Sequence, residues 1–275
     1  MPSTPVQQPI AFIGGGNMAG ALIAGLLQSG RAPGSILVVE PDDRQRAKLA
    51  LQYGVHARHA PEASLAAAAL VVWAVKPQAF AEAAAPCAEF VNRALHLSVM
   101  AGVRTAAIEA ATDAHRVVRA MPNTPALIGR GIAGLYATAQ TSAEDRAAAE
   151  GVLACTGTTL WVQREADLDA VTALSGSGPA YVFYFIEAMM QAAGEMGLSA
   201  EQGRLLALQT FAGATALAAQ STDSPATLRE RVTSRGGTTY AALMSLDNDA
   251  VKAAFVRALH AAKKRAQELG DEIGS

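Results

Sequence analysis

The chain has 275 residues, 51% of them hydrophobic and 17% charged, which suits one large domain or two ordinary domains with substantial cores. Its 22 basic and 24 acidic residues give a net charge of −2, which argues against nucleic acid or a membrane surface as a partner. Met1–Pro9 lacks the features of a signal peptide, and the apolar run Leu65–Val75 is too short to cross a bilayer. We therefore expect a cytoplasmic protein in which Cys87 and Cys155 are buried free thiols.

The first part of the chain alternates short apolar strands with helical patterns. A strand is expected at Ile10–Ile13, followed by a glycine turn and a helix at Asn17–Gln28. The next predicted elements are strands at Ile36–Val39, Leu70–Val75, Leu95–Val99 and Val117–Ala120, and helices at Asp43–Tyr53 and Thr105–Ala111. Buried strands that alternate with helices predict an α/β fold of the Rossmann type, a doubly wound parallel sheet with helices on both faces.

The pattern changes after Asn123. Edge strands are expected at Ile132–Tyr136 and Thr159–Val162, around a helix at Ala143–Ala154. The rest of the chain reads as helices at Pro179–Met196, Ala200–Gln220, Pro225–Val232, Tyr240–Ser245 and Ala250–Leu269, with Gly197 and Gly270 as C-terminal caps. We place a domain boundary between residues 163 and 164, so that an all-helical domain occupies 164–275. Its apolar helix surface exceeds the need of one small bundle and predicts a dimerisation domain.

The motif Gly-x-Gly-x-x-Ala, here Gly14, Gly16 and Ala19, follows a predicted strand and opens a predicted helix. This context is typical of a dinucleotide-binding fingerprint. Gly14 permits the tight turn, Gly16 lets a pyrophosphate approach the backbone, and Ala19 permits close packing of helix on strand. With Asn17 and Met18, these residues are the first candidates for cofactor binding. A Gly-rich turn without a ligand is the alternative.

Glu40 ends the second predicted strand, where an acid would accept a hydrogen bond from the ribose 2′-hydroxyl of NAD. Its charge would repel the 2′-phosphate of NADP. Arg44, Arg46 and Lys48 follow, however, and offer cations for that phosphate. Alternatively, Glu40 caps the next helix and the basic residues form a solvated face. The choice between NADP and NAD is open from these residues.

Three later strand ends carry small or polar residues, at Ala74–Pro77, Ser98–Gly102 and Met121–Pro125. Ligands bind at the carboxyl edge of such sheets, so these loops predict the nicotinamide side of one cleft. Each alone would be an ordinary loop. The cofactor candidates that they supply are Ala74, Val75, Lys76, Pro77, Ala101 and Asn123.

The segment Val232–Tyr240 places two adjacent glycines between hydroxyl residues, directly before a helical pattern. The free N–H groups of a first helical turn suit a small anion, and a Thr hydroxyl there can donate a proton or a hydrogen bond. The segment predicts a carboxylate pocket, with a turn capped by Ser or Thr as the alternative. Ser175–Pro179 is similarly either a ligand-facing turn or an interdomain linker.

Motifs of other enzyme classes are missing from the sequence. It contains no Gly-x-Ser-x-Gly elbow and no His-Glu-x-x-His site, so we expect no metal. The histidines fall outside every candidate loop: His56, His59, His96, His115 and His260. This inventory fits a hydride transfer to an imine, assisted by a hydroxyl group.

Five stretches together resemble pyrroline-5-carboxylate reductase: Ile13–Ala19, Val75–Pro77, Arg119–Ala126, Val171–Tyr181 and Val232–Thr239. The resemblance runs from about Pro9 to Leu269 in the same order. It implies that NADPH or NADH delivers a hydride to the C=N carbon of 1-pyrroline-5-carboxylate and forms L-proline, the last step of proline biosynthesis. It also implies an interlocked homodimer, in which the partner's helices complete the substrate pocket and which often assembles into a decamer.

The resemblance further implies roles for the residues of the Gly-Gly turn. The substrate-binding residues would be Ser234, Gly236, Gly237, Thr238 and Thr239. In particular, the turn from Gly236 to Thr239 would hold the substrate carboxylate. Thr239 would be the catalytic residue, hydrogen-bonded to the ring nitrogen as a proton donor.

Two positions depart from the family. Arg235 stands where the family usually has Pro, and Glu40 stands where NADPH-preferring members commonly have a polar and a basic residue.

Two competing functions are a related Rossmann reductase for another cyclic imine or a hydroxy acid, and a dinucleotide-binding sensor without catalysis. The first usually has a catalytic Lys in its helical domain, whereas this helical region has no Lys before Lys252. The hydroxyl-lined turn argues against the second.

Overall fold

A computed structural model describes residues 7–273. The chain divides into two compact units. The first comprises the residues up to Ser177 and those from Ala262 onward, and the second comprises Gly178–Ala261. This break comes later than the predicted domain boundary between 163 and 164, because helix α7 (Asp167–Val171) packs against strands of the first unit.

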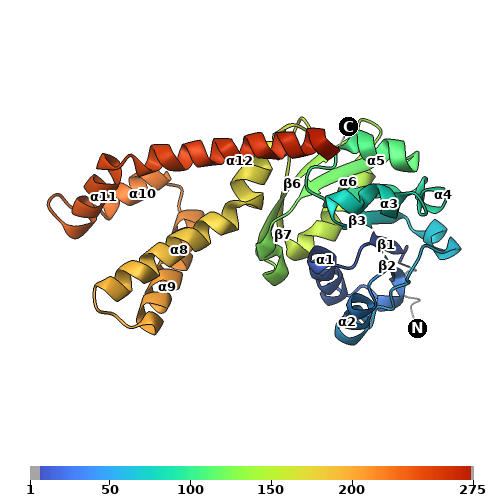
Figure 1. Cartoon of the computed structure of the whole chain (residues 1–275), viewed down its shortest axis with the longest axis horizontal. Coiled ribbons are helices and arrows are strands. Elements are labelled where there is room, and N and C mark those ends of the chain that lie inside the picture. Colours follow the sequence, from blue (N-terminus) through green and yellow to red (C-terminus); the bar gives the residue numbers. More distant parts are fainter. Residues whose placement is uncertain (1–6, 274–275) are drawn as a thin grey trace. The chain divides into compact units, whose positions relative to one another are not determined.

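A seven-stranded sheet forms the centre of the first unit, with the strand order β2-β1-β3-β4-β5-β6-β7. Figure 1 shows this sheet with helices of the same unit around it. The strands are β1 (Ile10–Ile13), β2 (Ile36–Val39), β3 (Leu70–Trp73), β4 (Leu95–Ser98), β5 (Val117–Met121), β6 (Gly131–Ala137) and β7 (Gly157–Trp161). Strands β1 to β5 run parallel, β6 is antiparallel to β5, and β7 is parallel to β6. The prediction of a doubly wound, Rossmann-type sheet is confirmed.

Helices cover both faces of this sheet. One face carries α1 (Asn17–Gln28), α2 (Asp43–Tyr53) and α6 (Ala143–Leu153), and the other carries α3 (Phe80–Ala84), α4 (Ala88–Val91) and α5 (Thr105–Thr112). Successive strand residues point to opposite faces. Phe12 therefore joins the core with Leu22 and Leu49, whereas Ile13 joins the other core with Phe80.

Short helical turns connect these elements. They are the 3-10 turns η1 (Pro33–Ser35), η2 (Ala63–Ala67), η3 (Pro77–Ala79), η4 (Thr124–Ile128) and η5 (Ala154–Thr156), and the π-helical turn η6 (Thr172–Gly176).

Two strand predictions need correction. The segment predicted as an edge strand at Ile132–Tyr136 is β6, which lies between β5 and β7. The other predicted edge strand, at Thr159–Val162, corresponds to β7 and does lie at the edge of the sheet. The strand predicted at Leu70–Val75 already ends at Trp73.

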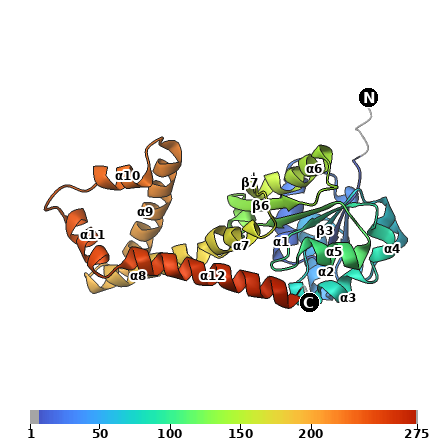
Figure 2. The ribbon, with the colours of Figure 1, turned by 90° about the horizontal axis from the view of Figure 1, so that it is seen from above.

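The second unit is helical. Its helices are α8 (Gly178–Glu195), α9 (Ala200–Gln220), α10 (Pro225–Arg231), α11 (Thr238–Asn248) and the first part of α12 (Val251–Ile273) (Figure 2). Helices α8 and α9 pack closely at Gly203, where a Cβ would lie 2.9 Å from that of Ala193. Phe255 of α12 contacts Tyr181 and Phe185 of α8 edge to face.

Much of the apolar surface of this unit is exposed. Exposed large side chains occur on both α8 and α9: Phe183, Tyr184, Leu205, Leu206 and Leu217. An apolar surface of this kind marks an interaction site. No helix among residues 7–273 is long and apolar enough to span a membrane.

The two predicted glycine caps differ in outcome. Gly197 has a φ of 88° and follows α8, as predicted for a C-terminal cap. The prediction for Gly270 is wrong, because this residue lies inside α12. A Cβ at Gly270 would lie 2.6 Å from Arg104 Nη2, so this glycine permits a close approach of Arg104 within the first unit, to which this end of α12 belongs. Cys87 is a buried free thiol as expected, but Cys155 is only half-buried.

A charged network fastens α7 to the sheet. The buried guanidinium of Arg119 on β5 donates to Glu165 Oε1 at 3.1 Å. Glu165 also accepts from the amide (2.8 Å) and the hydroxyl (2.9 Å) of Thr105 at the start of α5. Arg104 donates to both carboxylate oxygens of Asp169 at 3.1 and 3.0 Å. Burial lowers the pKa of Arg119, and Glu165 opposes that shift.

A neutral histidine is fixed in the core. Trp73 Nε1 donates to His96 Nδ1 at 2.9 Å, so His96 Nε2 carries the proton and donates to the Val91 carbonyl at 2.9 Å. Burial lowers the pKa of His96 from 6.5 to about 4.

This histidine predicts a stability change with pH. Between pH 6.5 and about 4 the unfolded chain binds a proton that folded His96 does not, so stability falls as the pH falls through this window. The full loss is about 3 kcal/mol. Urea unfolding at several pH values measures it. His96→Gln should flatten the slope, whereas His260→Gln, at an exposed position, should leave it unchanged. Equal slopes for His96→Gln and the wild type would contradict the assignment.

Candidate active site

Gly14 sits where three strands converge. Its φ is 96°, and its amide donates to the Val39 carbonyl of β2 at 2.8 Å. A Cβ at this position would lie 2.7 Å from the carbonyl oxygen of Ala74, directly after β3. The left-handed backbone and the close approach both require glycine. This confirms the expected role of Gly14 in the tight turn.

The start of α1 is open to a ligand. A Cβ on Gly16 would have no neighbour within 4 Å. The Gly16 carbonyl accepts the first helical bond from Gly20 at 2.8 Å, so the amides of Asn17, Met18 and Ala19 have no partner within the helix. Such amides at a helix N-terminus bind phosphate. The methyl group of Ala19 is buried against the sheet.

Glu40 holds the glycine loop. Its Oε2 accepts from the Gly15 amide at 2.7 Å and its Oε1 accepts from the Asp42 amide at 2.9 Å. Gln45 Nε2 donates to the Gly15 carbonyl, so both sides of that residue are fixed. The alternative that Glu40 caps the next helix is wrong, because Asp42 caps α2 by accepting from the Gln45 amide at 2.8 Å.

The predicted phosphate-binding cations differ in their availability. Arg46 Nη1 donates to the carbonyl oxygens of Glu40 and Pro41, both at 2.8 Å, and Nη2 pairs with Asp43. Its guanidinium is therefore engaged by the loop that follows β2. The other two basic residues of α2 are exposed: Arg44 and Lys48.

A pocket of about 360 Å³ opens at the carboxyl ends of β1, β2 and β3, beside Gly14. Its walls are mostly apolar: Val39, Pro41, Val75, Ala79, Ala83 and Pro86. In an open α/β sheet, ligands bind at this edge where the strand order reverses, here between β1 and β3. An apolar slot of this size suits a planar ring such as adenine.

The sequence did not predict the segment of this pocket that contains His59, Ala60 and Pro61. These three residues line the pocket, so one histidine lies at it although it falls outside every candidate loop of the sequence. The preceding residue, Arg58, pairs with β2: its amide donates to Val38 at 2.7 Å, and its carbonyl accepts from Glu40 at 2.8 Å. This isolated pairing positions the segment and has no local sequence signal. Gly14 and Val75 are the predicted cofactor residues that line this pocket.

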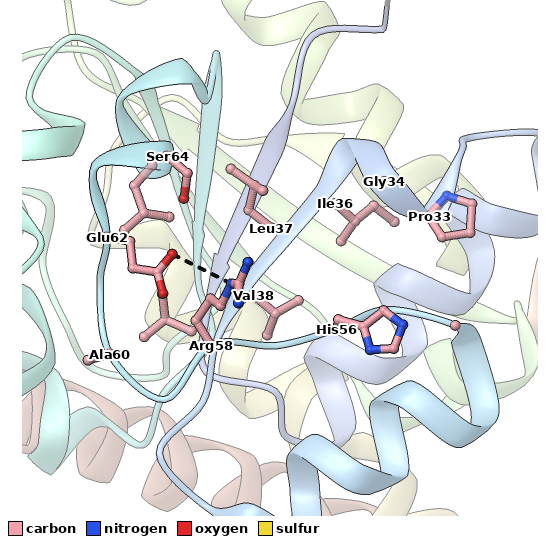
Figure 3. A pocket seen from close by; sticks show the side chains of 13 residues that line it. Pro33, Gly34, Ile36, Leu37, Val38, His56, Arg58, Ala60, Glu62 and Ser64 are labelled. Carbon is pink, nitrogen blue, oxygen red and sulfur yellow. Dashed lines mark ion pairs between the residues drawn. The ribbon is translucent and has the colours of Figure 1, made fainter.

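A second pocket, of about 320 Å³, lies along the outer edge of β2 (Figure 3). Arg58 and Glu62, an ion pair at 3.5 Å, lie on one side of it, and His56 lies near its other end. The pocket reaches Pro33 and Gly34, which precede β2. It contains none of the predicted site residues.

The loops after β3 and β4 lie at the same sheet edge, because these strands are parallel neighbours. Ala74 donates its amide to the Ile13 carbonyl at 2.9 Å, and Val75 lines the apolar pocket. Lys76 is exposed and precedes the turn η3, which Pro77 begins. Ala101 is exposed in the loop after β4.

The side chain of Asn123 makes two hydrogen bonds that hold the loop after β5 in place. Its Nδ2 donates to the Ser175 carbonyl at 3.2 Å, and its Oδ1 accepts from the Ile132 amide at 3.0 Å. The side-chain amide thus ties this loop to β6 and to the π-helical turn η6. That turn runs on through Ser177 into α8, without an extended linker.

The Gly-Gly segment of the second unit forms a tight turn. The Gly237 amide donates to the Ser234 carbonyl at 3.0 Å, and Gly236 has a φ of 76°. A positive φ at the third residue is typical of a type II β-turn, with Arg235 at its second position. The Ser234 hydroxyl lies beside Gly237, 2.6 Å from where a Cβ would be.

Helix α11 begins directly after this turn. Gly237 is its N-cap and no side chain caps it, so the alternative of a turn capped by Ser or Thr is wrong. The first helical bond runs from the Ala241 amide to the Gly237 carbonyl at 3.1 Å. The amides of Thr238, Thr239 and Tyr240 therefore have no partner within the helix and suit a carboxylate.

The sequence matches two family models. Residues 165–269 match the model described as pyrroline-5-carboxylate reductase dimerisation, and residues 9–102 match the model described as NADP oxidoreductase, coenzyme F420-dependent. The pyrroline-5-carboxylate reductase of Pseudomonas aeruginosa is 44% identical over 269 residues, which cover 96% of this chain and 98% of the relative.

Solved structures agree with the sequence matches. A pyrroline-5-carboxylate reductase from Coxiella burnetii has a TM-score of 0.89 at 36% identity, over 95% of this chain and 98% of its own. A pyrroline carboxylate reductase from Plasmodium falciparum, with NADP bound, has a TM-score of 0.86 at 26% identity, over 96% of this chain and 98% of its own.

Substitutions at the two fingerprint glycines should separate ligand contact from folding. Gly16→Ala places its methyl group in open space, so the chain should fold normally but bind NADH and NADPH about tenfold more weakly. Gly14→Ala should lower the melting temperature because its Cβ meets the backbone of Ala74. Calorimetric titration and thermal unfolding measure the two effects. Undiminished cofactor binding by Gly16→Ala would place the pyrophosphate elsewhere.

The turn before α11 predicts a stabilising substitution. Proline is favoured at the second position of a type II turn, so Arg235→Pro should stabilise the chain by about 0.4–1 kcal/mol by restricting the unfolded state. Denaturant unfolding measures this change. Arg235→Ala removes the same charge without a ring and should give no such gain. A loss of stability in Arg235→Pro would show that the turn needs the Arg235 amide or another φ.

Proposed function

We propose that this chain, which belongs to the pyrroline-5-carboxylate reductase family, performs the family's reaction with a dinucleotide site at Gly14–Ala19 and a carboxylate cradle at Ser234–Thr239. Enzymes of this family catalyse the last step of proline biosynthesis. They are NAD(P)H-dependent oxidoreductases that reduce 1-pyrroline-5-carboxylate to L-proline.

The first unit supplies the cofactor site. The open backbone at Gly16 and the free amides of Asn17 and Met18 bind the pyrophosphate, and the pocket between Pro41 and Val75 takes the adenine ring. When bound, the nicotinamide supplies the hydride. The loops that contain Lys76, Ala101 and Asn123 follow β3, β4 and β5 and border the nicotinamide.

One observation above all supports the substrate site: the first turn of α11 has free amides, no side-chain cap and a glycine turn in front of it. The free amides of Thr238 and Thr239, with the Ser234 hydroxyl, hold the substrate carboxylate. The ring nitrogen of the substrate is bonded to the carbon that carries this carboxylate. It therefore lies within reach of the same helical turn. Thr239 is half-exposed there and donates its hydroxyl proton to that nitrogen.

The role of Thr239 is mainly one of position. A hydroxyl is too weak an acid to act by matching its pKa to the reaction. The C=N carbon is already electrophilic, so the enzyme gains most by orienting hydride donor and acceptor. The Thr239 hydroxyl fixes the ring nitrogen and relays the proton that the nitrogen takes up.

The second unit supplies the contact between subunits. The dimerisation match over residues 165–269 and the exposed apolar side chains of α8 and α9 support oligomerisation. The proposed form is a homodimer in which the partner's helices complete the substrate pocket, with further assembly into a decamer. Besides the second subunit, the proposed partner of the chain is the small-molecule substrate. Nucleic acid and membranes are not part of the proposal. Free thiols and the reducing cofactor suit the cytoplasm.

Substitution of Thr239 tests the catalytic assignment. Thr239→Ala should lower kcat by about tenfold or more, because the nitrogen loses its positioned donor. Thr239→Ser keeps the hydroxyl and should retain most of the activity. Steady-state oxidation of NADH or NADPH with 1-pyrroline-5-carboxylate measures both. Unchanged turnover in Thr239→Ala would remove this residue from the mechanism, and faster turnover of another cyclic imine by the wild type would reassign the substrate.

A further inference from the structure

We propose that Glu40 makes this chain bind NADH in preference to NADPH, and that it does so with the same carboxylate that holds the fingerprint loop. This inference rests on the proposed dinucleotide site and adds a cofactor preference to it.

The Glu40 carboxylate is held in one place. Its two oxygens accept from the amides of Gly15 and Asp42 at 2.7 and 2.9 Å. Glu40 lies between Val39 and Pro41, which both line the apolar pocket, and the amide that it fixes adjoins the open backbone of Gly16. The carboxylate therefore lies between the places proposed for the adenine ring and the pyrophosphate, which the ribose of the cofactor connects.

The chemistry of this carboxylate favours a hydroxyl. Each carboxylate oxygen has a second lone pair, so Glu40 keeps its contacts to Gly15 and Asp42 while it accepts from a ribose hydroxyl. A 2′-phosphate carries a charge of about −1.5 to −2 near pH 7 and has no proton to donate in its dianionic form. At the same position it meets only repulsion from Glu40.

The surroundings offer that phosphate little compensation. None of the described residues that line the pocket is Lys or Arg, and its titratable residues are His59 and Glu82. Arg46 already donates to two carbonyls and pairs with Asp43, and the other two basic residues of α2, Arg44 and Lys48, are not among the residues that line the pocket. To bind a phosphate, Arg46 would have to give up contacts that shape the loop after β2. Asp42 and Asp43 add further negative charge.

The discrimination is measured as binding, without turnover. Calorimetric titration of the full chain should give a dissociation constant for NADPH roughly tenfold above that for NADH, the size expected for charges near the protein surface. Glu40→Gln keeps an acceptor for the Gly15 amide but removes the charge. It should tighten NADPH binding about tenfold and change NADH binding less than about threefold.

Two controls keep the test independent of folding. Glu89→Gln removes the same charge from an exposed site on α4 outside the pocket and should leave both affinities unchanged. In the wild type, the preference should shrink as KCl is raised to about 0.5 M, because salt screens the repulsion. Equal or tighter NADPH binding by the wild type, or equal shifts for both cofactors in Glu40→Gln, would overturn the proposal while leaving the reductase function intact. Binding of neither cofactor would overturn both.

Discussion

The contact of the Gly14 backbone with two neighbouring strands is the constraint on which the cofactor site depends. No side chain fits there, since a Cβ would meet the Ala74 carbonyl, and the Gly14 amide is already bonded to Val39. This contact brings the ends of β1, β2 and β3 together. Consequently Glu40 reaches the Gly15 amide, and the next residue, Gly16, faces open space at the start of α1.

The proposed substrate cradle, like the cofactor site, consists of a glycine turn directly before a helix. At Gly236 a positive φ turns the chain, and α11 then begins without a side-chain cap. In both units a glycine turn is followed by a helix whose first amides are free. One such start suits a pyrophosphate and the other a carboxylate. The ion pair between buried Arg119 and partly exposed Glu165 contributes indirectly, because it fastens α7 and the following π-helical turn to the sheet that carries the cofactor site.

Local patterns predicted most of the fold. The bounds of α1, α2 and α9 agree with the sequence prediction, because apolar periodicity and capping residues such as Asp42 and Ser199 act over a few positions. The glycines of both turns were found for the same reason: their backbone requirements are local. The family resemblance supplied the reaction, which composition and spacing alone left open.

Long-range contacts account for what the sequence did not reveal. Gly270 looked like a helix cap, yet it lies within α12 and makes room for Arg104. His59 reaches the pocket only because Arg58 pairs with β2, and the bond from Glu40 to Gly15 joins residues 25 positions apart. The position of β6 inside the sheet depends on pairing with β7, which no local pattern encodes. Such contacts are visible only in the folded chain.

The central claim is that this chain couples nicotinamide oxidation to reduction of a five-membered cyclic imine. The most direct test is the stoichiometry of the purified chain's reaction with 1-pyrroline-5-carboxylate, in which L-proline is quantified alongside the oxidised cofactor. We predict one L-proline for each NADH or NADPH consumed. Failure to oxidise either cofactor, or oxidation without L-proline formation, would contradict the account.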